Sequence, residues 1–238
     1  MSRLGAISSI SVIREIKSRR FVIPDIHGCC RTFRKLVTET LCLQRTDELY
    51  LLGDMIDRGP DSKGVLDFIL ELRHQGYSLR GVKGNHEEMC LRADESLETR
   101  ELWFANGGLA TLRSFAVESG SEIPRRYRNL LQSLPTHILL DDFVIVHAAL
   151  NFENSNPFGD SKAMLWMREC RVDSARIGGR RLVSGHTPVT REQLTASLAT
   201  DRILLDNGCV FTGSQGLGSL AALELDSMRV WYQENIDR

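Results

Sequence analysis

The sequence predicts an α/β fold, a two-sheet β-sandwich flanked by helices, on three observations. In the first 90 residues, short apolar runs alternate with segments whose apolar residues recur at helical spacing. This order favours partly parallel strands packed against helices. The second half contains several short strand-like runs, which favours a second sheet. A stretch with helical character at about 88–134 lies between the two and is expected to form a helical insertion.

The individual elements follow from this pattern. Strands are predicted at 21–23, 49–52 and 77–83, separated by helical faces at 33–41 and 65–72. In the insertion, Asn106-Gly107-Gly108 breaks the helical pattern, and a further helix is expected to begin near Pro124. Strands are then predicted at 138–140, 143–146, 182–183, 203–205, 219–225 and 230–232.

The composition excludes several classes of protein. The chain has 238 residues, of which 42% are hydrophobic and 26% charged, and its formal net charge is −1. These values are ordinary for a globular protein and argue against a collagen-like or disordered chain. The balanced charge gives no indication of a nucleic-acid polymer as partner. The six cysteines form no CxxC pair, so we interpret them as free thiols in a reducing compartment.

The first 20 residues are expected to be an N-terminal leader, followed by a single domain at 21–238. The apolar stretch of the leader, from Ala6 to Ile13, is too short for a membrane span and too polar for a signal peptide. No other window reaches membrane length. We therefore expect a cytoplasmic protein that does not associate with a membrane.

Polar side chains follow five of the predicted strands at their carboxyl ends. In open α/β sheets, ligands bind beyond these ends, so side chains that follow several strands are expected to converge on one site. The residues concerned are Asp25 and His27, then Asp54, Asp57 and Arg58, then Asn85 and His86, then His147, and finally His186.

The residue types in this set suit a divalent metal. Asp25 and His27 are two positions apart and face the same way in an extended chain. Carboxylate and imidazole ligands suit Mn, Fe or Zn, whereas a structural zinc site would be expected to use cysteine. The set includes six candidate metal ligands: Asp25, His27, Asp54, Asn85, His147 and His186. One ion needs fewer, but two ions that share Asp54 would use them all. Two ions roughly 3.5–4 Å apart activate water and clamp a phosphoryl group.

Five motifs in this order resemble the metallophosphoesterases of the phosphoprotein phosphatase type. They are DIHG at 25–28, GDMIDRG at 53–59, GNHE at 84–87, VHA at 146–148 and SGHTP at 184–188, and the resemblance extends from residue 21 to about 210. LDNGCV at 205–210 resembles the bacterial and phage branch of serine/threonine protein phosphatases. The resemblance implies the calcineurin-like fold, with the helical insertion beside the site.

The resemblance also implies a binuclear metal centre. By this correspondence, Asp25 and His27 hold the first ion, and Asp54 bridges the two ions. The coordination of the second ion is completed by Asn85, His147 and His186. We expect the two ions to be Mn²⁺, with Fe or Zn as alternatives. In such enzymes a metal-bridging hydroxide attacks phosphorus in line.

Four further residues receive catalytic or phosphate-binding roles by the same resemblance. His86 is expected to protonate the leaving alkoxide, and Asp57 to orient His86. Arg58 and Arg168 are expected to bind phosphate oxygens, the second of them on a weaker motif match within MLWMREC.

The expected function is removal of phosphate from phosphoserine and phosphothreonine, with a phosphorylated protein or a small phosphoester as substrate. A diadenosine tetraphosphate hydrolase is an alternative, because that branch shares the five motifs. A nucleotide hydrolase needs a pocket for adenine, whereas a protein phosphatase needs an open groove. An inactive metal-binding scaffold is a third possibility, but it predicts loss of a ligand or of His86, and all are present.

Neighbouring residues have simpler interpretations. Asp61 is expected to cap the helix that follows it, and Glu87 to support the site or start a helix rather than bind metal. Cys29 and Cys30 are expected to be small packing residues at a helix start, with redox sensitivity as a less favoured alternative.

Overall fold

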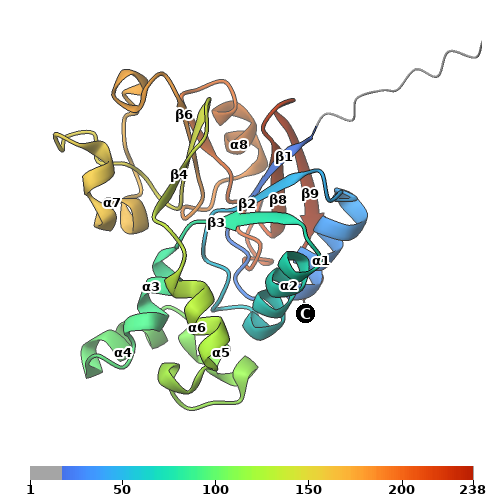
Figure 1. The fold of residues 1–238 in the computed structure, drawn as a ribbon, viewed down its shortest axis with the longest axis vertical. Helices are drawn as coiled ribbons and strands as arrows, with labels where there is room; N and C mark the ends of the chain where they lie inside the picture. The colour runs from blue at the N-terminus through green and yellow to red at the C-terminus, as the bar shows by residue number, and fades with distance from the viewer. Residues whose placement is uncertain (1–17, 238) are drawn as a thin grey trace, which may run out of the picture.

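The computed structural model describes residues 18–237, which form two β-sheets with helices on their outer faces (Figure 1). The five-stranded sheet has the order β3-β2-β1-β8-β9 and the four-stranded sheet the order β4-β5-β6-β7. The first sheet contains β1 (Arg20–Ile23), β2 (Glu48–Leu51), β3 (Ser78–Gly81), β8 (Ser219–Glu224) and β9 (Arg229–Glu234). The second contains β4 (His137–Leu139), β5 (Phe143–Val146), β6 (Arg181–Ser184) and β7 (Arg202–Leu204). The predicted two-sheet α/β architecture is confirmed.

Each sheet has a parallel part that leads to the site. Strands β1, β2 and β3 run parallel, and β8 joins β1 antiparallel. Strands β5, β6 and β7 also run parallel, and β4 pairs antiparallel with β5 through a turn at Asp141-Asp142. The carboxyl ends of the parallel strands in both sheets carry the polar residues singled out in the sequence.

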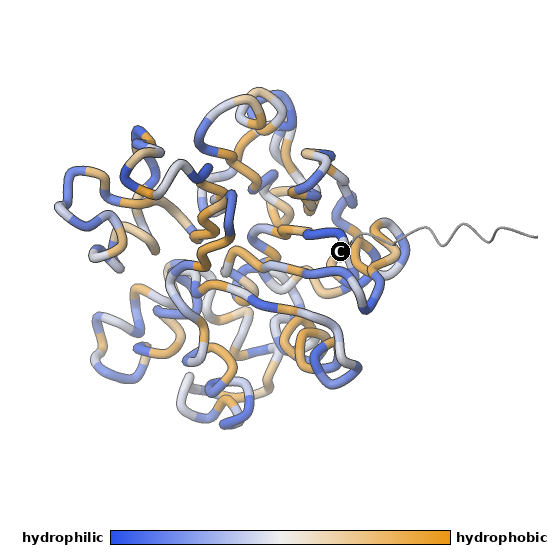
Figure 2. Tube along the Cα trace, turned by 45° about the horizontal axis from the view of Figure 1, so that its top comes forward, coloured by the Kyte–Doolittle hydropathy of each residue, from blue (hydrophilic) through white to orange (hydrophobic). Residues whose placement is uncertain are grey.

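The alternation of side chains along β1 shows how the layers pack. Val22 lies in the apolar cluster between the two sheets, together with Phe143, Ile145 and Val183 of the second sheet. Phe21, its neighbour, points to the opposite side and joins the cluster beneath the helices. Figure 2 shows the hydrophobic residues concentrated along the inner strands and hydrophilic ones in the outer loops.

Helices α1 (Cys30–Lys35) and α2 (Ser62–His74) pack on the first sheet, and η1 (Leu36–Thr40) continues α1. The side chain of Asp61 accepts a hydrogen bond from the Gly64 amide, which confirms it as the cap of α2. Cys29 and Cys30 are buried at the start of α1, as expected of packing residues.

The helical insertion contains α3 (Asn85–Arg92), α4 (Leu97–Ala105), α5 (Gly108–Phe115), η2 (Gly120–Glu122) and α6 (Arg125–Gln132). The predicted break falls between α4 and α5, where Gly107 has a φ of +100° and packs against Arg58. A Cβ at Gly107 would lie 2.8 Å from the Arg58 Cγ, so the turn requires glycine. This contact joins the insertion to the loop after β2.

Short helices in the second half were not predicted. They are α7 (Ser161–Trp166), α8 (Arg191–Ser197), η3 (Pro157–Gly159) and η4 (Ser174–Ile177). Six or seven residues are too few to show a helical period, although Asp160 and Thr190 cap α7 and α8 with their side chains. Met164 of α7 packs on the outer face of the second sheet.

The expected leader falls almost entirely outside the described residues. Within them, Arg19 forms an ion pair with Asp47 at 2.6 Å, and Arg20 is already part of β1. No helix among residues 18–237 is both long and apolar enough to cross a membrane.

Candidate metal centre

The loops after the strands hold the predicted site residues in unusual backbone conformations. Positive φ values occur at eight non-glycine residues of the described chain, and five of these belong to the site: His27, Asp54, Asp57, Arg58 and His186. A left-handed conformation at such a residue costs roughly 1–3 kcal/mol and persists only where the surroundings enforce it. Backbone bonds supply that enforcement, since the amides of Ile26 and His27 both donate to the Asp54 carbonyl at 3.0 and 2.8 Å.

Two glycines let carboxylates approach the backbone closely. A Cβ at Gly84 would lie 2.1 Å from Oδ1 of Asp54, and one at Gly185 would lie 2.2 Å from Oδ1 of Asp25. Any larger residue would push these carboxylates out of place. The amide of His186 donates to Asp25 at 3.0 Å, which fixes that carboxylate between the two sheets.

Asp54 lies at the centre of the cluster. Its Oδ2 is 3.4 Å from Nε2 of His147, 3.7 Å from Nε2 of His27 and 3.8 Å from Nε2 of His86. His147 Nε2 also lies 2.9 Å from Oδ1 of Asn85 and 3.1 Å from Nδ1 of His186. The structure thus brings residues from loops up to 159 positions apart, from His27 to His186, into one cluster.

The hydrogen bonds of two histidines fix which ring nitrogen faces the cluster. His27 Nδ1 donates to the Ile56 carbonyl at 3.0 Å, and His147 Nδ1 donates to the Leu52 carbonyl at 2.8 Å. A carbonyl only accepts, so Nδ1 carries the proton and the lone pair of Nε2 points inward. Burial lowers the pKa of both rings, and burial with the Arg168 charge lowers the pKa of His186 to about 4. All three rings are therefore neutral near pH 7, the form that binds metal.

The pKa values of the carboxylates in the cluster shift in the opposite direction, upward. Burial raises the pKa of Asp25 and of Asp54 well above the ordinary value, and for Asp54 the neighbouring charges of Asp25 and Glu87 add to this effect. Asp206, which follows β7, is also buried and raises the pKa of Asp25 further. Burial raises the pKa of Asp206 itself to about 6.

The donor set fits divalent cations. Two groups of described residues offer ligand atoms within 4.8 Å of one another: His27, Asp54 and His86, and Asp54, His147 and His186. Nε2 of His147 lies 2.9 Å from Oδ1 of Asn85 and 3.4 Å from Oδ2 of Asp54. Each of these atoms presents a lone pair, and a cation stabilises such an arrangement. Neutral imidazole and carboxylate ligands without cysteine suit Mn, Fe or Zn. Asp54 belongs to both groups, the position predicted for a bridging ligand.

The remaining predicted ligands lie around these groups. Asp25 contacts the cluster by accepting a hydrogen bond from the His186 amide. Asn85 contacts it through Oδ1, which lies 2.9 Å from Nε2 of His147. Glu87 is buried, and its two oxygens accept from the amides of Asp54, Met55 and Gly84, each at 2.8 Å. This confirms Glu87 as a residue that supports the site, because it holds the loop that carries Asp54.

His86 and Asp57 form a fully buried pair beside the cluster. Nδ1 of His86 lies 2.7 Å from Oδ2 of Asp57, and its Nε2 is buried with no hydrogen-bond partner among residues 18–237. The carboxylate of Asp57 also accepts from Trp103 Nε1 at 2.8 Å and from Thr111 Oγ1 at 2.5 Å. Asp57 therefore fixes the His86 ring with its free nitrogen directed at the Asp54 side.

Both predicted phosphate-binding arginines are exposed at the site. The Arg58 guanidinium contacts Nε2 of His27 and lies 5.7 Å from the ring centroid of Phe211. Arg168 lies after α7, and its charge acts on His186.

Three residues of the site were missed by sequence reasoning. Trp103 and Thr111 lie in the helical insertion, where their sequence pattern is typical of core and turn residues, and no pattern marks them as partners of Asp57. Asp206 carried a detectable signal, because it follows a strand within LDNGCV.

The family model for calcineurin-like phosphoesterases matches residues 18–210. The chain belongs to this family. Serine/threonine-protein phosphatase 1 of Salmonella typhimurium (strain LT2) is 30% identical over 84% of this chain and 91% of its own length. The asymmetrical bis(5'-nucleosyl)-tetraphosphatase PrpE of Bacillus velezensis is 27% identical over 83% of this chain and 86% of its own length.

Solved structures support the calcineurin-like fold. A candidate diadenosine tetraphosphatase superposes with a TM-score of 0.67 at 20% identity, covering 95% of this chain and 97% of its own. A protein serine/threonine phosphatase from Saccharomyces cerevisiae superposes with a TM-score of 0.62 at 16% identity, covering 94% and 82%. Calcineurin-like phosphoesterases hydrolyse phosphoesters with a binuclear divalent metal centre, and the His and Asp groups of this chain are able to bind metal.

Proposed function

We propose that this phosphoesterase removes phosphate from phosphoserine and phosphothreonine, using two divalent ions. The observation that carries the proposal is the buried His86–Asp57 pair next to Asp54, which supplies an oriented proton donor at a metal-binding cluster. The proposed metal ligands are Asp25, His27, Asp54, Asn85, His147 and His186. Mn²⁺ is the proposed ion, with Fe or Zn as alternatives.

When bound, the two ions supply a water-derived nucleophile near neutral pH and neutralise charge on the phosphoryl oxygens. Residues of the chain bind the phosphoryl group and supply the proton for the leaving group. The exposed guanidinium groups of Arg58 and Arg168 bind phosphate oxygens and orient the phosphoryl group. His86 donates a proton from Nε2 to the leaving oxygen, and the Asp57 carboxylate at Nδ1 stabilises the cationic ring before that transfer.

The relative from Salmonella supports a protein substrate, because it aligns over most of both chains and its name states serine/threonine-protein phosphatase. The exposure of Arg58 also supports a large substrate, since the phosphate is reached from the surface. A dinucleoside tetraphosphate is the second candidate. It is supported by the Bacillus relative and by a cavity beside the site, which a nucleotide hydrolase needs. An inactive scaffold is not supported, since His86 and all six proposed ligands are present.

The deciding experiment compares three substrates with the Mn²⁺-loaded enzyme: p-nitrophenyl phosphate, a phosphoserine peptide and diadenosine tetraphosphate. The proposal expects hydrolysis of the first two and a higher kcat/KM for the phosphopeptide than for the dinucleotide. The reverse order would establish the second candidate. Absence of turnover with Mn²⁺, Fe²⁺ and Zn²⁺ on every substrate would overturn both.

A further inference from the structure

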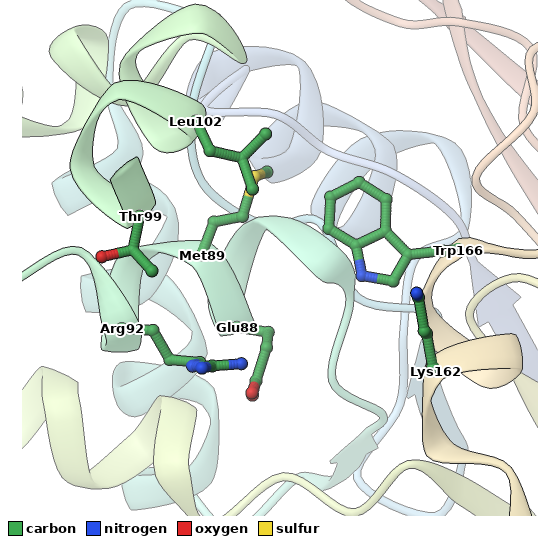
Figure 3. Close-up of a pocket in the computed structure, with 7 residues that line it drawn as sticks. All are labelled: Glu88, Met89, Arg92, Thr99, Leu102, Lys162 and Trp166. Carbon is green, nitrogen blue, oxygen red and sulfur yellow. The ribbon is translucent and has the colours of Figure 1, made fainter. Parts of the chain in front are cut away.

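A cavity of about 360 Å³ lies between the helical insertion and α7 (Figure 3). Met89, Leu102 and Trp166 form its apolar part, and Glu88, Arg92 and Lys162 stand around it. Residues from α3, α4 and α7 thus face one another across the space.

The cavity adjoins the metal centre. The ring of Trp166 lies 6.5 Å from the ring of His186, centroid to centroid. On the other side, Glu88 and Met89 belong to α3, the helix that begins with Asn85 and His86. A group bound in the cavity would therefore lie close to the metal-binding cluster.

The size of the cavity favours a small molecule over a single peptide side chain. Pockets for small ligands occupy roughly 300–1,000 Å³, are mostly apolar and contain a few polar groups. This cavity falls within that range and has both kinds of lining. One amino-acid side chain would leave much of it unfilled, whereas a nucleoside would occupy most of it.

The lining also suits a purine base joined to phosphates. The indole of Trp166 offers a flat aromatic surface, and every nucleobase stacks on such a surface. Lys162 extends toward the edge of this indole in Figure 3. Lys162 is exposed and forms no ion pair with a carboxylate of the described residues, although its charge acts at longer range on Asp160. Its ammonium group is therefore open to a phosphate. By contrast, Glu88 pairs with Lys83 at 3.3 Å, and Arg92 with Glu95 at 2.9 Å.

We infer that this cavity is a nucleoside subsite, in which a purine base of a nucleoside polyphosphate stacks on Trp166 while Lys162 contacts the phosphate chain. The inference rests on the proposed hydrolysis at the metal centre and gives its second candidate substrate a binding site. A phosphopeptide that uses the same cavity is the competing outcome of the test.

The test compares the Mn²⁺ enzyme with Trp166→Ala, Trp166→Phe and Leu102→Ala variants. The readout is kcat/KM for diadenosine tetraphosphate divided by kcat/KM for p-nitrophenyl phosphate, which has no base. We expect the ratio to fall about tenfold in Trp166→Ala, to fall less in Leu102→Ala, and to be largely restored in Trp166→Phe. Leu109→Ala is the matched control, because Leu109 is 45% exposed against 47% for Leu102 but lines a different surface hollow.

Adenosine binding in EDTA provides a readout without metal or turnover. Saturation-transfer NMR is expected to detect contacts of the adenine protons with the wild-type protein and to lose them in Trp166→Ala. If p-nitrophenyl phosphate is hydrolysed but the ratio and adenosine binding do not change, the inference is overturned while the metal-dependent hydrolysis stands. A fall in phosphopeptide kcat/KM without a fall for the dinucleotide overturns it in favour of a peptide subsite. If no substrate is hydrolysed, the proposed function fails.

Discussion

The indole Nε1 of Trp103 lies 2.8 Å from Oδ2 of Asp57, the same oxygen that accepts from His86. Both partners are completely buried. A residue of the helical insertion thus takes part in orienting the proposed proton donor. The helical insertion therefore lies beside the site and also helps to hold its residues in place.

Trp103→Phe removes this hydrogen bond and keeps an aromatic ring. We expect kcat to fall about 10- to 100-fold with little change in KM, because residues that orient site groups have effects of this size. Stability is expected to fall by about 1–3 kcal/mol, since a buried acceptor loses a donor. Steady-state kinetics and urea unfolding measure both. Trp231→Phe is the control, because Nε1 of Trp231 has no hydrogen-bond partner in the described part of the chain. Equal kinetic losses in the two variants would refute the role of Trp103.

His86→Asn tests the proton donor through the leaving group. On a phosphoserine peptide, kcat is expected to fall by about 10²- to 10⁴-fold. The loss should be smaller on p-nitrophenyl phosphate, because its leaving group is a stable anion that needs less protonation. Metal content, measured by plasma mass spectrometry, should persist. His137→Asn, at a half-buried histidine outside the site, is the control. Identical losses on the two substrates would exclude proton donation by His86.

Asp54→Asn tests the shared ligand. Asp54 lies within 3.8 Å of the Nε2 atoms of three histidines, and its Oδ1 accepts from the His86 amide at 3.1 Å. An asparagine retains that acceptor but not the charge, so we expect both ions to bind at least ~10-fold more weakly with the fold preserved. Metal titration followed by calorimetry measures this. Asp61→Asn is the control, because asparagine caps a helix as well as aspartate. Loss of one ion alone would contradict a bridging role.

Asp142→Asn tests an ion pair that joins the two sheets. Arg20 of β1 donates to Asp142 at 2.9 and 3.0 Å and to Asp226 at 3.0 and 3.2 Å. The Arg20 hydrogen bond lowers the pKa of Asp142 below its ordinary value near ~4. The stabilisation is therefore complete above that ordinary pKa and is lost as the pH falls through the lower, folded-state pKa.

The expected difference in unfolding free energy between wild type and Asp142→Asn is at most ~1 kcal/mol at pH 7, because the pair is partly exposed. It should shrink as the pH is lowered below ~4 and also in high salt. Urea unfolding across this range measures it. A difference that grows on acidification would show that the pair does not act in this way.

The sequence predicted the cluster because its signal is local. His147 directly follows β5, and Asp54 and Asn85 lie three and four positions after the ends of β2 and β3. Parallel strands deliver such residues to the same edge of a sheet. The cap at Asp61 and the break at Gly107 were predictable for the same reason, since each depends on a few neighbouring residues. The helices α7 and α8 were not, because one or two turns show no period.

The sequence by itself determined the two-sheet α/β fold and the set of polar side chains at its strand ends, because strand and turn preferences act over a few residues. Only the tertiary structure decided that Trp103 and Thr111, 46 and 54 positions after Asp57, hold its carboxylate. The same holds for the placement of Trp166 against the insertion, where it forms a cavity with Leu102. These contacts depend on how layers of the fold pack, and a side chain that packs in a core has the same sequence pattern whether or not its polar atom reaches the site.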